Sequence, residues 1–336
     1  MKSLKFLPLL LIPLLSACNS GSTESSETKP TGGTAQAATD FKVALLTPGP
    51  VSDAGWNALA NQGLQAIAKD VGAETNSQEA KGTQIRDAFR SYAQKGYNLV
   101  IGHGYEYNEP ASEVAGDFPD TVFLTSSGGK IGPNLGAFRF NLEEAFYLAG
   151  MMAATMSKTG KIGWVALGNI PSIDSTIKAY EAGAKVAKPG IIIKKQVLQD
   201  DKDVAAAQRA TEELANAGVD FVIHQANNAA QGVFNAAKAK GIYAIGANWN
   251  QNDNPSGAVV ASAVIISEPA FLSIAREVKE KKFKGRQIVM GMQAGAIEFI
   301  INPAFEAKVP EAVKAMLKAK TDSIKNGDLL VPLDTF

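Results

Sequence analysis

Aromatic and amide side chains stand together at several points of this sequence, where they are suited to bind a flat, uncharged molecule. The clearest pair is Trp56 and Asn57, which directly precede an alanine-rich stretch. An indole ring stacks on planar ligands, and a carboxamide offers both a donor and acceptors to the edge of such a ring. Ser52 and Asp53 come just before this pair, and either is a candidate helix N-cap. These residues alone leave two interpretations open: the segment binds a ligand, or Asp53 only caps the helix while Trp56 covers the core.

Further polar and aromatic groups follow other apolar runs of the chain. The segment Gly246 to Gln251 is the most suggestive, because it carries three amides and an indole. A lone histidine is more often structural than ligand-binding, and neither of the two histidines has cysteines or carboxylates at a metal-binding spacing. We therefore expect no metal and no cofactor. The candidate ligand-binding residues are Ser52, Asp53, Trp56, Asn57, His103, Tyr105, Ser126, Asn227, Asn248 and Trp249.

The elements that position these residues form an internal repeat. Runs rich in Val, Ile and Leu alternate with alanine-rich helical stretches, which is typical of parallel sheets flanked by helices. Expected strands at 42–46, 96–101 and 122–124, with helices at 58–71 and 83–95, are matched by strands at 161–165, 218–223 and 243–245 and helices at 175–187 and 203–217. The sequence therefore predicts an α/β protein of two doubly wound parallel-sheet lobes. Loops at the carboxyl ends of the strands would hold a ligand between them.

A hinge must join two such lobes so that a ligand can enter. We expect the chain to cross between them near Phe138 to Asn141, near Ser262 to Ser267 and near Met290 to Gln293. The first lobe then comprises residues 40–139 and about 265–290. The second comprises residues 140–264 and about 291–336.

The N-terminal segment predicts export and a lipid anchor. Lys2 and Lys5 flank the start of an apolar stretch, Phe6 to Leu15, that is too short to span a bilayer. Leu15-Ser16-Ala17-Cys18 resembles a bacterial lipobox, although an ordinary signal with a chance cysteine is the alternative. We expect a signal peptide at 1–17, lipidation of Cys18, and a flexible tether over 18–39, which is rich in small and polar residues. The expected location is the cell membrane, on the side away from the cytoplasm.

Charge and motifs argue against two classes of function. The chain has 33 basic and 33 acidic residues and no basic tract, so we expect no nucleic-acid partner. It lacks the nucleophile elbow, the phosphate-binding loop and the dinucleotide fingerprint, so we do not expect an enzyme. Doubly wound lobes also host hydrolases and transferases, however, and Asp53 or Glu106 would be the first suspects in that case.

Four motifs in one order resemble the basic membrane protein family of ABC-importer lipoproteins, which includes the purine nucleoside receptor of spirochaetes. The resemblance covers the chain from about Lys42 to Glu298. The motifs are Gly49-Pro-Val-Ser-Asp53-Ala-Gly-Trp56-Asn57 followed by Gly63, Asn141-Leu-Glu-Glu-Ala-Phe-Tyr-Leu-Ala-Gly150, Ser157-Lys-Thr-Gly-Lys-Ile-Gly163, and Tyr243-Ala-Ile-Gly246.

This resemblance implies a type I periplasmic-binding fold and a purine nucleoside or nucleobase held between aromatic rings. By the family pattern, Trp56 takes the place of the stacking aromatic and Asn57 that of the amide that reads the base. The chain departs from the pattern at Ser126 and Asn248, where the family often has acids, and it lacks a lysine around 261–266. These groups help to hold ribose in the receptor, so a free nucleobase or another neutral ring fits this chain at least as well.

The sequence thus predicts a monomeric solute-binding lipoprotein that captures a purine nucleoside or nucleobase for an ABC permease and its ATPase. The alternatives are a binding protein for a sugar or other small neutral solute and, with less support, an enzyme that processes nucleosides.

Overall fold

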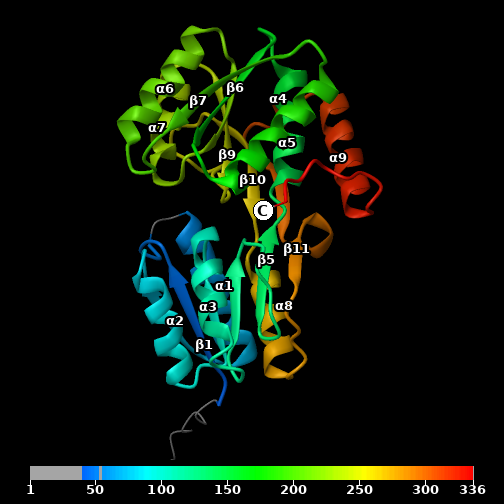
Figure 1. Cartoon of the computed structure of the whole chain (residues 1–336). Coiled ribbons are helices and arrows are strands. Elements are labelled where there is room, and N and C mark those ends of the chain that lie inside the picture. Colours follow the sequence, from blue (N-terminus) through cyan, green and yellow to red (C-terminus); the bar gives the residue numbers. More distant parts are fainter. Residues whose placement is uncertain (1–39, 53–54, 336) are drawn as a thin grey trace, which may run out of the picture. The chain divides into compact units, whose positions relative to one another are not determined.

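The computed structural model describes residues 40–52 and 55–335, which belong to one compact unit of the chain. The predicted signal peptide, the tether, Cys18 and Asp53 lie outside the described residues. Helices and strands alternate and build two six-stranded sheets (Figure 1). Each sheet with its helices forms a lobe, and β5, β10 and β11 lie where the two lobes meet.

The first sheet has the strand order β11-β5-β4-β3-β1-β2, and all of its strand pairs are parallel. Its strands are β1 Lys42–Thr47, β2 Glu74–Glu79, β3 Leu99–Gly102, β4 Val122–Ser126, β5 Leu135–Phe140 and β11 Gln287–Met290.

The second sheet repeats this topology with the order β12-β10-β9-β8-β6-β7, and only β12 is antiparallel to its neighbour. Its strands are β6 Lys161–Leu167, β7 Ile192–Leu198, β8 Phe221–Gln225, β9 Tyr243–Asn248, β10 Val259–Ile265 and β12 Ile297–Ile301.

Helices cover both faces of each sheet. In the first lobe α1 packs on α8 and α2 on α3, and in the second α4 packs on α5 and α6 on α7. The helices are α1 Trp56–Val71, α2 Gln84–Gln94, α3 Asn108–Ala115, α4 Glu143–Met156, α5 Pro171–Ala187, α6 Val204–Asn216, α7 Ala230–Lys240, α8 Glu268–Lys279 and α9 Glu311–Lys325. Short 3-10 turns are η1 Tyr105–Tyr107, η2 Asn227–Ala229, η3 Met292–Ala294 and η4 Glu306–Lys308.

The central strand β1 shows why the sheets are covered on both sides. Val43 and Leu45 join the apolar core beneath α1 and α8, whereas Ala44 and Leu46 join the core beneath α2 and α3. A strand buried on both faces reads as a continuous apolar run, and β1 has such a sequence. The edge strand β2 is mostly exposed and carries only polar residues.

The chain passes from one sheet to the other three times: after β5, after β10 and between β11 and β12. After β5 the chain forms α4, which packs on α5 of the second lobe, and after β10 it forms α8, which packs on α1 of the first lobe. Each lobe is therefore completed by a helix that follows a strand of the other lobe.

The start of α1 corrects one expectation. Ser52 is not its N-cap, because the helix begins at Trp56 with Gly55 as N-cap. The reason is that Val51 and Ser52 still belong to a turn, so the helix starts later than a cap at Ser52 would require. Ser52 is exposed.

A candidate ligand-binding cavity

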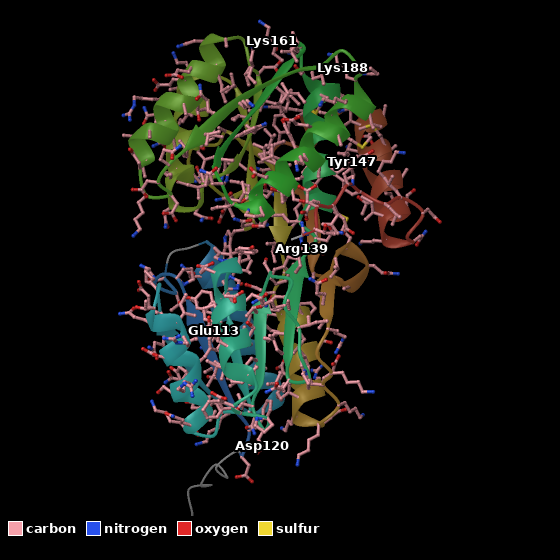
Figure 2. All side chains as sticks on the ribbon, in the orientation of Figure 1. Glu113, Asp120, Arg139, Tyr147, Lys161 and Lys188 are labelled. Atoms are coloured by element: carbon pink, nitrogen blue, oxygen red, sulfur yellow. The ribbon has the colours of Figure 1, made fainter. Side chains whose placement is uncertain are left out.

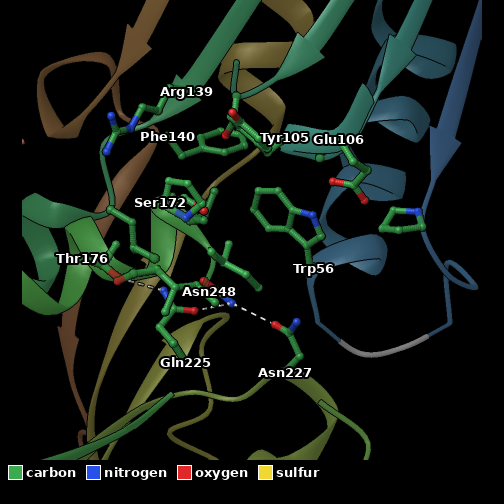
Figure 3. Close-up of a pocket in the computed structure, with 18 of the residues that line it drawn as sticks. Trp56, Tyr105, Glu106, Arg139, Phe140, Ser172, Thr176, Gln225, Asn227 and Asn248 are labelled. Carbon is green, nitrogen blue, oxygen red and sulfur yellow. Dashed lines mark hydrogen bonds between the residues drawn. The ribbon is translucent and has the colours of Figure 1, made fainter. Parts of the chain in front are cut away.

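A cavity of about 480 Å³ lies at the carboxyl ends of the strands, and both lobes contribute to its wall (Figure 3). This volume falls within the range of small-molecule sites. The first lobe and the crossing after β5 contribute Pro48, Trp56, Gly104, Tyr105, Glu106, Ser127, Arg139, Phe140, Leu142 and Glu143. The second lobe contributes Asn169, Ile170, Pro171, Ser172, Ile173, Thr176, Gln225, Asn227, Asn248 and Ile265.

Trp56 is held in the wall by the buried His103. Their rings stack with centroids 3.9 Å apart, and His103 Nε2 lies 2.9 Å from the backbone oxygen of Trp56. A carbonyl oxygen can only accept, so Nε2 carries the proton and Nδ1 accepts from the hydroxyl of Ser126, 2.9 Å away. Burial lowers the pKa of His103 to about 3, so the ring is neutral at physiological pH. The indole therefore rests on a fixed, uncharged support.

Three amide groups at the ends of β8 and β9 form a hydrogen-bonded cluster in the second lobe. Asn248 Nδ2 donates to Gln225 Oε1 at 3.2 Å and to Asn227 Oδ1 at 3.4 Å. Gln225 Nε2 donates to Thr176 Oγ1 at 3.4 Å (Figure 3). Because each amide has both donors and acceptors, the cluster keeps capacity for a ligand with mixed hydrogen-bonding edges.

Backbone geometry points several of these residues into the cavity. Within the described ranges, five residues other than glycine have a positive φ, and four of them line the cavity: Ser127, Asn169, Asn227 and Asn248. Each lies at the end of a strand or within two residues after it. Asparagine tolerates the left-handed conformation better than most residues, and such conformations cluster at binding sites. The amides are therefore placed by the backbone as well as by their side-chain bonds.

The described part of the wall carries one guanidinium group, Arg139, and two carboxyl groups, Glu106 and Glu143. Burial raises the pKa of both carboxyl groups, and for Glu143 the nearby Arg139 and the hydroxyl of Ser175 act in the opposite direction. An anionic ligand such as a phosphate would meet no excess of positive charge here. The wall suits an uncharged ligand better.

The structure places the predicted residues in three groups. Trp56, Tyr105, Asn227 and Asn248 line the cavity, whereas His103 and Ser126 lie behind Trp56. The other predicted residues that the structure describes do not line the cavity: Asn57 is buried, Ser52 is exposed and Trp249 is half-buried.

Sequence reasoning missed much of the wall, most clearly the segment Asn169 to Thr176 at the start of α5. The internal repeat carried a signal for it. This segment follows β6 as the segment around Trp56 follows β1, so equivalent positions in the two halves face the same cavity. Gln225 was also missed, although it lies only two residues after the strand predicted at 218–223 and is the last residue of β8.

Within residues 40–52 and 55–335, no three His, Cys, Asp or Glu side chains form a group that could hold a metal ion. In the same part of the chain, no helix is both long enough and apolar enough to cross a bilayer.

Two α/β lobes that share a cavity at the carboxyl ends of their strands define a solute-binding protein of the type I periplasmic-binding fold. The chain belongs to the Bmp family, the PnrA-like ABC transporter substrate-binding proteins, which matches residues 41–329. The resemblance to this family and the predicted fold class are thereby confirmed.

Curated relatives span most of the chain at low identity. The transcriptional activator protein Med of Bacillus subtilis (strain 168) is 27% identical over 82% of this chain and 89% of its own length. A purine-binding protein of Brucella abortus (strain 2308) is 26% identical over 89% and 85%. The ABC transporter nucleoside-binding protein BmpA of Lactococcus lactis subsp. cremoris (strain MG1363) is 28% identical over 90% and 92%.

Among solved structures, an ABC transporter solute-binding protein of Conexibacter woesei DSM 14684 has the same fold. It superposes with a TM-score of 0.72 at 24% identity and covers 87% of this chain and 99% of its own.

Proposed function

We propose that this protein captures a purine nucleoside or nucleobase outside the cytoplasm and delivers it to an ABC importer without altering it. The observation that carries the proposal is the pairing of Trp56, stacked on neutral His103, with the amide cluster of the opposite lobe. A purine offers a flat face for the indole and a donor and acceptor edge for the amides.

Two similar proteins support this ligand class by their names, since one is purine-binding and another is nucleoside-binding. Closure of the lobes would remove the bound ring from water, and the permease would recognise the closed form. We also propose that Cys18 carries a lipid that anchors the protein to the outer face of the membrane.

Calorimetric titration with adenosine, guanosine, inosine, adenine and hypoxanthine tests the ligand class. We expect at least one of them to bind and to be recovered chemically intact. Trp56→Leu should weaken this binding roughly 5- to 150-fold, because stacking of an aromatic ring on a base contributes on the order of 1–3 kcal/mol. Trp249→Leu is the matched control, because Trp249 does not line the cavity. The purine assignment fails if none of the five ligands binds.

A sugar or other polyol is the second candidate, because the indole together with Glu106 and Glu143 also suits hydroxyl-rich rings. Ribose and common hexoses belong in the same titration series. Binding of sugars without binding of purines would replace the purine proposal.

The anchor has its own test in cell fractionation. Wild-type protein should follow the membrane fraction and label with a fatty-acid probe, whereas Cys18→Ser should lose both properties. Retention of the label in Cys18→Ser would contradict lipidation at this residue.

A further inference from the structure

The crossing from β5 to α4 places a charged pair in the cavity wall. Arg139 is near the end of β5 and Glu143 is the first residue of α4. Figure 2 shows Arg139 at the level where the two lobes meet. Both side chains are well covered, with 14% of Arg139 and 1% of Glu143 exposed. The pair therefore sits in a site that is largely withdrawn from water.

Three of the described residues contact the guanidinium group of Arg139. Its Nη2 contacts Glu143 Oε1 and lies 3.0 Å from the hydroxyl oxygen of Ser175. Its Nη1 donates to the backbone oxygen of Asp334, whose own backbone N–H donates to Ser175 at 3.0 Å. Arg139 is thus occupied by the protein, and its role toward Glu143 is to hold one carboxylate oxygen in place.

The other oxygen of this carboxylate, Glu143 Oε2, is buried and has no hydrogen-bond partner among the described residues. The neighbouring Glu144 differs, because it accepts from the backbone N–H of Met292 at 2.6 Å and from Asn141 Nδ2 at 2.9 Å. Buried carboxylate oxygens rarely go without a donor, because their desolvation is costly. Glu143 belongs to the cavity lining, so a donor on a bound ligand is the candidate partner of Oε2.

We propose that Glu143 is a specificity-determining residue whose Oε2 accepts a hydrogen bond from a ribose hydroxyl of the ligand. This inference rests on the proposed function and deepens it, because it selects the nucleoside over the free base. A base held by Trp56 and the amide cluster would leave Oε2 without a donor. A carboxylate that accepts from ribose hydroxyls is a recurrent mode of ribose recognition.

Glu143 is the better placed of the two carboxylates in the described lining. In the described lining the only other carboxylate belongs to Glu106. Its side chain folds back over Gly104, where an added Cβ would lie 2.4 Å from the Glu106 Oε2 atom. The buried position and the fixed partner of Glu143 make it the better-organised acceptor.

The test is calorimetry with the full-length protein and matched ligands. For the purine that binds, wild type is titrated with the nucleoside, its 2′-deoxy and 3′-deoxy analogues, and the free base. We expect at least one deoxy analogue to bind roughly 10-fold more weakly than the nucleoside, which is the loss of one charge-assisted hydrogen bond. This arm needs no variant, so it holds even if a substitution impairs folding.

The second arm uses Glu143→Gln, which keeps the shape of the side chain and removes its charge. Its affinity for the nucleoside should fall roughly 10-fold or more, while its affinity for the base stays within about threefold of wild type. Glu268→Gln is the control, because Glu268 begins α8 after β10 as Glu143 begins α4 after β5, yet it lies outside the lining.

The outcomes separate the two proposals. Equal binding of nucleoside, deoxy analogues and base by wild type overturns the role of Glu143 and leaves purine capture standing. Equal losses of nucleoside and base in a folded Glu143→Gln protein also overturn it. Absence of any purine binding removes the proposed function and this inference with it.

Discussion

At the scale of single residues, the cavity depends on side chains that never touch its interior. His103 supports the indole of Trp56, and Ser126 in turn satisfies the ring nitrogen that His103 leaves as an acceptor. The residue that stacks on a ligand is thus fixed by two buried residues on neighbouring strand ends. Replacing either His103 or Ser126 should first make the Trp56 side chain less ordered.

Ser126→Ala should therefore destabilise the protein and loosen the indole together. Removing the hydroxyl leaves His103 Nδ1 buried without a donor, at a cost of about 1–3 kcal/mol in the free energy of unfolding. Urea unfolding measures this loss, and the anisotropy of tryptophan fluorescence reports the order of the indoles. Ser112→Ala is the control, because the Ser112 hydroxyl only donates to the Glu109 carbonyl at the protein surface. Equal stability of the two variants would speak against the supporting role.

Asn248 permits a separate test of backbone strain, because its φ is 67°. Asn248→Gly and Asn248→Ala both remove the amide, but only alanine keeps a Cβ in the left-handed conformation. The alanine variant should be less stable than the glycine variant by about 1–2 kcal/mol. Urea midpoints of the two variants give this difference directly. If alanine were as stable as glycine, the left-handed backbone would not be required at this position.

At the scale of helices and strands, most of the repeat could be predicted, because buried parallel strands are continuous apolar runs. The strand expected at 42–46 is β1, and that at 161–165 is the first part of β6. The edge strand β2 escaped prediction, since Glu74 to Glu79 face solvent and carry no apolar signal. Helix α5 starts at Pro171, four residues before the expected start, because alanine content marks the body of a helix and not its first turn.

The cavity wall was predictable only in part, because the sequence locates strand ends but not the direction in which their side chains point. Sequence locates strand ends, and Trp56, Tyr105, Asn227 and Asn248 do line the cavity. It does not show which neighbour faces the cavity and which lies behind it, and so His103 appeared equivalent to Tyr105. The charged pair at the crossing was missed because its position depends on how β5 leaves the first sheet.

The contact between α4 and α5 depends on glycine and gives a prediction at this scale. A Cβ at Gly150 would lie 2.0 Å from the carbonyl oxygen of Tyr180, and one at Gly183 would lie 2.0 Å from that of Tyr147. Gly150→Ala should force the helices apart and lower the free energy of unfolding by about 1–3 kcal/mol. In Gly116→Ala the new methyl meets nothing within 4 Å, so this variant should be no less stable than wild type. Thermal melts compare the two variants, and equal melting temperatures would contradict the close contact.

At the scale of the whole molecule, the two histidines make stability depend on pH. Burial lowers the pKa of His103 to about 3 and that of His224 to about 4, from an ordinary value of 6.5. At a pH between the ordinary pKa and the lowered one, a histidine of the unfolded chain binds a proton and the same histidine of the folded chain does not. Their contribution to stability is therefore fully present above about pH 6.5 and is lost as the pH falls toward 4 and 3.

We expect each histidine to lower the free energy of unfolding by about 2 kcal/mol between pH 6.5 and pH 5. Urea titrations at several pH values measure this slope, and His103→Gln or His224→Gln should each flatten it. The raised pKa values of the buried Glu143 and Glu144 act in the opposite direction, so the difference between variant and wild type isolates the histidine part. A slope that is unchanged in both variants would show that folding does not lower the pKa values of the two histidines.

The exchange of helices between the lobes also constrains the order in which the chain can fold as it is synthesised. The face of α1 around Gly63 packs against Phe271 of α8. Strand β5 pairs with β11, Gln287–Met290, which completes the sheet. Neither partner exists when the ribosome has made only β1 to β5. That lobe cannot mature cotranslationally as an independent unit, and so the polypeptide stays open to chaperones, or to translocation in an unfolded form, until nearly all of it has been made.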